Sequence, residues 1–189
     1  MNKNKYFVYA GNAYPHKNLN RLVEAVILLN KSVDEPVYLK IASSRNVFTE
    51  RLEKEIKKLG AEKYVKLLGF VPDDKLPELY RDSVAFVFPS VSEGFGLPGI
   101  EAMEAGTLVL ASDIPVFREV YKNAATYFNP LDFTSIERTM KIALEMSDLE
   151  RKEKIDFAQK FVKRYSWEKM ARETLKVYEK AYLSKSPLT

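Results

Sequence analysis

Short apolar segments alternate with segments of helical periodicity along most of the chain, and no other feature limits the possible folds so strongly. The expected strands cover residues 6–10, 37–42, 65–70, 84–88, 107–111 and 125–128. The expected helices cover residues 19–31, about 48–59, 73–82, 98–106, 131–146, 148–165 and 166–182. The alternation predicts an α/β fold: a single Rossmann-like, doubly wound parallel sheet of about six strands, with helices on both faces and extra C-terminal helices.

The length of 189 residues predicts one domain, residues 1–189, which is large enough to bury a core. Segment 84–88 is apolar throughout, as expected of a central strand that is buried on both faces. Near the C-terminal end, the aromatic residues Phe157, Phe161, Tyr165 and Trp167 are expected in the core. Asp73 and Asp74 follow a proline and are expected to cap the helix after them.

Charge and composition exclude several classes of protein. The net charge is +4, with acidic residues spread among the basic ones, which predicts a mixed-charge surface and leaves anionic ligands or a membrane surface as further possibilities. Basic clusters interleaved with aromatic residues are missing, so nucleic acid is not an expected partner. No apolar run approaches the roughly 20 residues that span a bilayer, and the first residues lack a signal peptide's apolar segment. With no cysteine in the chain, we expect a cytoplasmic protein, with peripheral contact at the inner membrane face as an open alternative.

The segment 92–106 carries the strongest functional signal. Two carboxylates, Glu93 and Glu101, lie on either side of a glycine-rich turn that leads directly into a short helix. Glycines let backbone N–H groups approach phosphate oxygens, and a helix N-terminus adds a favourable dipole. Glu101, expected in the first turn of the helix, could accept hydrogen bonds from ribose hydroxyls, and Glu93 could hold a sugar hydroxyl. This layout suits a nucleoside diphosphate sugar.

Three loops are expected to meet at one edge of the sheet. They follow the first, third and fourth strands, at residues 11–18, 70–74 and 90–96. Ligands of open α/β sheets collect beyond the carboxyl ends of the strands. The expected fold and the candidate site therefore agree.

At this point the residues resemble a known family. The segment 93–106 is similar to the signature Glu, seven residues, Glu of the C-terminal, donor-binding domain of retaining glycosyltransferases with two Rossmann-like domains (GT-B type). The flanking residues 88–90 and 111–113 strengthen the likeness, which spans about residues 5–183. The resemblance implies transfer of a hexose from a nucleoside diphosphate sugar to a saccharide or lipid-linked acceptor.

A second match lies in residues 9–18. In the resembled family this loop carries an arginine directly after the glycine and a lysine further on, both facing the donor diphosphate. Lys17 matches the lysine, but Asn12 stands where the arginine is usual, so one cationic contact is absent. The variant resembles a mannosyltransferase-like subgroup and hints at GDP-mannose, with a UDP-hexose as the other donor class. Residues 70–72 match the segment whose backbone, at Val71, meets the base.

The resemblance implies roles for particular residues. Glu93 and Lys17 are the candidate catalytic residues, and no resident cofactor or metal is expected, because no Asp-x-Asp motif follows a strand. The candidate nucleotide- and diphosphate-binding residues are Gly11, Asn12, Lys17, Val71, Gly94, Phe95, Gly96, Leu97 and Glu101. Positive charge and backbone N–H groups would stabilise the departing diphosphate, and one such donor is typically worth about 3 kcal/mol of barrier.

Simpler interpretations accompany each candidate. Glu101 could only offset a helix dipole, Glu93 could be a solvated carboxylate, and Lys17 could only flank a helix start. Gly94 and Gly96 could serve turn geometry alone. His16, the only histidine, is expected at the surface rather than in catalysis.

The resembled enzymes also have an N-terminal domain that supplies the acceptor site, and this chain has room for one Rossmann-like unit. We therefore expect that domain to be absent, supplied by a longer chain or by a separate partner, and the isolated chain to transfer little sugar. Two alternatives stay open: a non-catalytic partner subunit that binds nucleotide sugar, and a sugar-nucleotide epimerase or phosphorylase of similar architecture.

Overall fold

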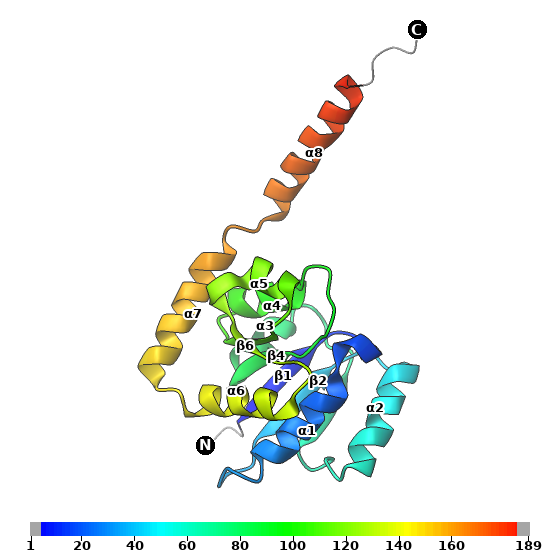
Figure 1. Cartoon of the computed structure of the whole chain (residues 1–189), viewed down its shortest axis with the longest axis vertical. Helices are drawn as coiled ribbons and strands as arrows, with labels where there is room; N and C mark the ends of the chain where they lie inside the picture. Colours follow the sequence, from blue (N-terminus) through cyan, green and yellow to red (C-terminus); the bar gives the residue numbers. More distant parts are fainter. Residues whose placement is uncertain (1–4, 185–189) are drawn as a thin grey trace.

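A six-stranded, all-parallel sheet forms the centre of the protein (Figure 1). The structure is a computed structural model and describes residues 5–184. The strand order is β3-β2-β1-β4-β5-β6. The strands are β1 (Tyr6–Ala10), β2 (Tyr38–Ala42), β3 (Val65–Gly69), β4 (Ala85–Phe88), β5 (Val109–Ser112) and β6 (Thr126–Phe128). This topology confirms the predicted α/β class and the doubly wound, Rossmann-like sheet.

The helices connect the strands and then continue beyond β6. They are α1 (Leu19–Leu29), α2 (Val47–Lys58), α3 (Leu76–Arg81), α4 (Leu97–Glu104), α5 (Pro115–Tyr121), α6 (Phe133–Glu145), α7 (Asp148–Val162) and α8 (Trp167–Leu183). Two short 3-10 helices cover Pro15–Lys17 and Lys122–Ala124. Within residues 5–184, no helix combines the length and apolar composition needed to cross a bilayer.

The order of the strands places β1 and β4 side by side at the point where the chain changes direction along the sheet. β1 pairs with β2 on one side and with β4 on the other, in a register that places Phe7 opposite both Leu39 and Ala85. Every residue of β1 and β4 is buried, because helices cover both faces of these strands. Helix α1 packs against α2 and α6, and α4 packs against α3 and α7, so the helices form two layers around the sheet.

Glycine and serine residues form caps at several helix ends. Gly60 and Gly106 adopt positive φ angles of 64° and 84° directly after α2 and α4, where glycine avoids the penalty of a Cβ. The Ser166 hydroxyl accepts a hydrogen bond from the Lys169 N–H and caps α8.

The region 73–82 differs from its prediction. Helix α3 begins at Leu76, and neither Asp73 nor Asp74 caps it; the residue before the helix is Lys75, which makes no side-chain cap hydrogen bond. The Lys75 and Leu76 N–H groups instead bond to the Pro72 carbonyl, so backbone groups close this helix start. The expectation that the two aspartates cap the helix was wrong.

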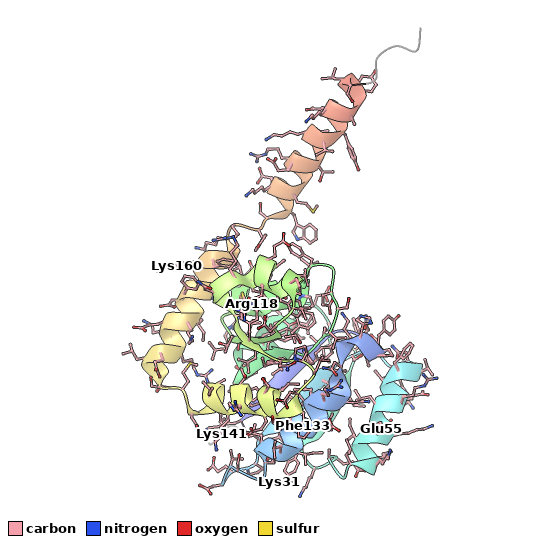
Figure 2. All side chains as sticks on the ribbon, in the orientation of Figure 1. Lys31, Glu55, Arg118, Phe133, Lys141 and Lys160 are labelled. Atoms are coloured by element: carbon pink, nitrogen blue, oxygen red, sulfur yellow. The ribbon has the colours of Figure 1, made fainter. Side chains whose placement is uncertain are left out.

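Helix α5 has no counterpart among the predicted helices. It is only seven residues long and begins at Pro115, which suits a first helical position. Arg118, labelled in Figure 2, pairs with Asp113 over 2.6 Å and holds the helix against the end of β5. Phe117, Val120 and Tyr121 are buried beneath the helix.

Of the four aromatic residues predicted in the core near the C-terminal end, two are buried or half-buried and two are exposed. Phe161 is buried and Tyr165 is half-buried, but Phe157 and Trp167 are 49% and 70% exposed. Trp167 is exposed because α8 buries none of its residues and extends away from the rest of the molecule (Figures 1 and 2). The expectation of core positions was therefore wrong for Phe157 and Trp167.

Candidate functional site

The loops that follow β1 and β4 are joined by hydrogen bonds at the C-terminal edge of the sheet. The Asn18 side-chain amide donates to the carbonyls of Pro89 and Pro130, over 3.0 and 2.8 Å, and the Val91 N–H donates to the His16 carbonyl over 2.8 Å. Asn18 is buried and adopts a left-handed conformation, with φ 58° and ψ 31°, which asparagine tolerates better than most residues. Asn18 thus fixes the position of its neighbour Lys17 relative to the β4 loop.

Lys17 and Glu93 form an ion pair between these two loops. Each side chain is only 12% exposed, so the pair is shielded from solvent much more than an ordinary surface salt bridge. The Lys17 ammonium also lies 5.7 Å from the centre of the Phe88 ring. The structure therefore brings the two candidate catalytic residues together, although the sequence analysis assigned them to different parts of a ligand.

The glycine-rich turn has its shape for steric reasons. Gly96 has a φ of 97°, and a Cβ at this position would overlap the Tyr121 hydroxyl and lie 2.8 Å from Cε1 of Phe117. A Cβ added at Gly94 would have no other atom within 4 Å. Turn geometry alone therefore explains why residue 96 is a glycine. At residue 94 a larger side chain would fit, so steric space does not explain the glycine there.

The turn presents free backbone donors to the solvent side of the sheet edge. Within the described part of the chain, the N–H groups of Gly94, Phe95, Gly96 and Leu97 donate to no protein acceptor. Gly94, Phe95 and Leu97 are exposed, and helix α4 begins directly after Gly96. Unpaired N–H groups at a helix start form an environment that favours anions.

A cavity of about 200 Å³ lies beyond the ends of β1, β2 and β3, and no residue of the glycine-rich turn lines it. Its lining includes the candidate residues Gly11, Asn12 and Val71. Gly11 has a φ of 143°, and a Cβ there would lie 3.0 Å from the Tyr9 hydroxyl. The Asn12 side chain accepts a hydrogen bond from the Tyr14 N–H, so Asn12 holds the loop in shape. A larger hollow of about 480 Å³ runs along α2 and the edge strand β3, away from the glycine turn.

Glu101 lies within α4, just beyond its first turn. The helix begins at Leu97, so Glu101 is its fifth residue, and no acidic residue occupies the first turn. The expectation of a carboxylate in the first turn was therefore wrong, because the helix begins one residue earlier than predicted. Loss of hydration, followed by the negative charges of Asp73 and Glu104, raises the pKa of the Glu101 carboxyl above its ordinary value, even though the residue as a whole is exposed. Asp73 belongs to the loop between β3 and α3, so charges of that loop and of α4 both act on Glu101.

The arrangement can hold a phosphorylated ligand through an ammonium group, free N–H groups and two carboxylates. Within residues 5–184, no group of three or more histidine, aspartate or glutamate side chains is placed to bind a metal ion. The ammonium, the free N–H groups and the carboxylates can supply hydrogen bonding and stabilisation of charge. His16 is exposed, and its ring lies 6.0 Å from that of Tyr14.

Two residues that contribute to this geometry were missed in the sequence. Asn18 follows the lysine of the matched loop, and an asparagine directly before a helical pattern could have been identified as a left-handed position. Tyr121 carries no local signal, because its contact with the glycine turn depends on how α5 packs against α4.

Comparisons with known proteins identify the family that this sequence matches. Residues 1–161 match the family described as "Glycosyl transferases group 1". The chain is 36% identical, over 169 residues, to the O-antigen chain mannosyltransferase RfbU of Salmonella typhimurium, covering 89% of this chain and 45% of that protein. It is 31% identical, over 174 residues, to the O-antigen chain mannosyltransferase B of Escherichia coli, covering 92% of this chain and 45% of that protein.

The fold is also found among solved structures. The sucrose-phosphate synthase of Thermosynechococcus elongatus superposes with a TM-score of 0.83 at 19% sequence identity, covering 97% of this chain and 47% of that one. The chain therefore spans about half the length of the relatives that it matches.

Proposed function

This chain belongs to the group 1 glycosyl transferases, and from that premise we propose that it binds the nucleoside diphosphate sugar used as the donor in glycosyl transfer. The observation that carries the proposal is the free N–H groups of residues 94–97 next to the Lys17–Glu93 pair, at the edge where β1 meets β4. Ligands of doubly wound sheets bind at this point of topological reversal.

Each candidate residue has a proposed role in donor binding. Lys17 and the N–H groups of residues 94–97 bind the diphosphate and stabilise the charge that it gains when the sugar bond breaks. Glu93 holds a hydroxyl of the donor sugar, and Glu101 accepts hydrogen bonds from the ribose. The 200 Å³ cavity that contains Gly11, Asn12 and Val71 receives the base.

Mannose is the proposed donor sugar, and GDP-mannose the proposed donor. Both matched O-antigen enzymes are named as mannosyltransferases. The acceptor in this proposal is a growing saccharide or a lipid-linked saccharide at the inner membrane face, and the product contributes to a surface polysaccharide.

Isothermal titration of the chain with GDP, UDP, ADP and their sugars tests the proposal directly. We expect one nucleotide class to bind, with Glu101→Ala weakening binding because two ribose hydroxyls lose their acceptor. Glu104→Ala, in the same helix and exposed, is the matched control and should bind as the parent does. Absence of binding by every nucleotide, or a Glu101→Ala variant that binds like the parent, would count against donor binding.

Opposite changes in stability and binding are expected for Glu101→Gln. Because the folded state raises the pKa of Glu101, the stability that this group contributes is fully present below the ordinary glutamate pKa and is lost as the pH rises through the raised value. At neutral pH the uncharged glutamine should therefore raise the Tm while weakening nucleotide binding. Scanning calorimetry across pH should show the Tm difference shrink in acid; a difference that stays constant across pH would contradict the assignment.

We further propose that α8 docks on an N-terminal acceptor domain, supplied by the same polypeptide or by a partner chain. Trp167, Met170 and Tyr178 lie at helical spacing on one face of α8, and each is more than half exposed. Residues 1–161 carry the family match, so α8 lies outside it. Sequencing the coding region upstream distinguishes a continuous reading frame from a separate gene.

The role of α8 predicts a contrast between the chain and the complete protein. Tyr178→Glu should leave the Tm of the 189-residue chain unchanged, because α8 buries nothing there, and should lower the Tm of the complete two-domain protein. Lys169→Glu, on the opposite face, is the matched control and should change neither. Equal effects of the two substitutions would remove the basis for a docking face.

Release of free nucleotide from donor, with and without acceptor, would separate transfer from epimerase or phosphorylase activity.

A further inference from the structure

Tyr121, the last residue of α5, lies directly beneath the glycine-rich turn. Its side chain is fully buried, and its ring stacks on Phe117 with the ring centres 5.0 Å apart. The hydroxyl donates a hydrogen bond of 2.5 Å to the Gly96 carbonyl. Residues from a helix outside the glycine-rich motif therefore form the floor of the turn.

The fit between Tyr121 and the turn is close at two positions. A Cβ at either Gly96 or Gly99 would overlap the Tyr121 hydroxyl, and one at Gly99 would also lie 2.6 Å from the ring carbon Cζ. The Gly96 carbonyl also accepts a hydrogen bond from the Gly99 N–H, over 3.1 Å. Glycine at both positions makes room for the phenol, and glycine at position 96 also permits the positive φ of the turn.

The stereochemistry of the peptide bond extends this contact to the exposed side of the turn. The bond between Gly96 and Leu97 is trans, because the described chain contains no cis peptide, so its C=O and N–H point in opposite directions. Since the carbonyl of Gly96 is turned inward to Tyr121, the N–H of Leu97 is turned outward. That N–H donates to no protein acceptor within the described residues.

We propose that Tyr121 is a positioning residue, which aims the Leu97 N–H and the turn of residues 94–96 at the donor diphosphate. The inference rests on the proposed function and adds to it a residue on which donor geometry depends. A turn held by its own glycines alone would sample several conformations, because glycine restricts the backbone least. The hydrogen bond to Gly96 selects one of them before the ligand arrives, which lowers the ordering cost of binding.

The surroundings keep the Tyr121 hydroxyl protonated. Burial raises its pKa strongly, the negative charge of Glu93 adds to the rise, and Tyr127 and Glu101 act in the same direction. The Gly99 backbone acts in the opposite direction on this pKa but does not outweigh burial. The phenol is therefore protonated at neutral pH and donates to the Gly96 carbonyl.

The test compares Tyr121→Phe with Tyr127→Phe. Both remove a tyrosine hydroxyl near α5, but the Tyr127 hydroxyl binds the carbonyls of Phe117 and Lys122, over 3.0 and 2.7 Å, and does not contact the turn. In titrations we expect Tyr121→Phe to weaken binding of the nucleoside diphosphate about 3–10-fold and to leave binding of the nucleoside alone unchanged. Tyr127→Phe should lower the Tm without changing either affinity.

Amide NMR spectra of the ligand-free chain provide a readout that does not require donor binding. In Tyr121→Phe, the signals of Gly94, Phe95, Gly96 and Leu97 should shift and broaden, whereas in Tyr127→Phe they should stay in place. A Tyr121→Phe variant with a lowered Tm but unchanged turn signals would overturn the positioning role. If the parent chain binds no nucleotide while the turn signals respond to Tyr121→Phe, the proposed function fails and the control of the turn by Tyr121 stands.

Discussion

Replacement of Gly96 by alanine is expected to lower the free energy of unfolding by about 2–5 kcal/mol, because it adds backbone strain to a steric overlap. The φ of 97° at Gly96 is unfavourable for any residue with a Cβ. The new methyl group would also collide with the Tyr121 hydroxyl and with Phe117, two side chains that are fully buried and cannot move away into solvent.

Gly94→Ala is the matched control for this prediction. It lies in the same turn, but a Cβ there meets nothing within 4 Å, so its stability should stay within about 0.5 kcal/mol of the parent. Urea unfolding followed by circular dichroism measures both variants. If Gly96→Ala were as stable as Gly94→Ala, the close contact between the turn and Tyr121 would be wrong.

Replacement of Lys17 by methionine is expected to weaken binding of the nucleoside diphosphate about 10–100-fold, because a charge-assisted hydrogen bond to phosphate contributes about 1.5–3 kcal/mol. Methionine keeps most of the side-chain volume over Phe88 but removes the ammonium group. It also leaves the Glu93 carboxylate, only 12% exposed, without its cation and close to an anionic ligand.

Glu93→Gln separates the two halves of the ion pair. Loss of the carboxylate frees Lys17 for the phosphates, so binding of the bare nucleoside diphosphate should be unchanged or stronger. Binding of the sugar nucleotide should become weaker, because the sugar hydroxyl loses its charged acceptor. Titrations of the single variants and of Lys17→Met/Glu93→Gln form a double-mutant cycle. Equal binding of the nucleoside diphosphate by the parent and Lys17→Met would refute the phosphate role of Lys17.

The sheet could be predicted from the sequence because each strand carries its own signal. Segments 6–10 and 84–88 are apolar at consecutive positions, and that pattern is decisive for strands buried on both faces. Helix α5 was missed because seven residues with one proline give too short a window for helical periodicity. Phe157 and Trp167 were misplaced because periodicity identifies an apolar face but does not show whether another element covers it.

The candidate site was predictable as a set of loops but not as a set of contacts. The loops after β1 and β4 meet as expected, because parallel strands deliver their carboxyl ends to one edge. The pairing of Lys17 with Glu93 depends on the separation of these loops, which is fixed by the hydrogen bonds of Asn18 and by the register of β1 against β4. The support that Tyr121 gives the turn likewise depends on packing between elements. Residue patterns along the chain do not reveal how close Lys17 lies to Glu93 or Tyr121 to the turn.

The central place of β1 has a consequence for synthesis on the ribosome. Its two partners, β2 and β4, are made later, and β4 follows only after two further helices and a strand. Until β4 emerges, one edge of the apolar strand β1 has no neighbour, and such edges promote aggregation. Nascent chains arrested before Ala85 should therefore depend on chaperones, whereas chains that have passed Phe88 can close the middle of the sheet.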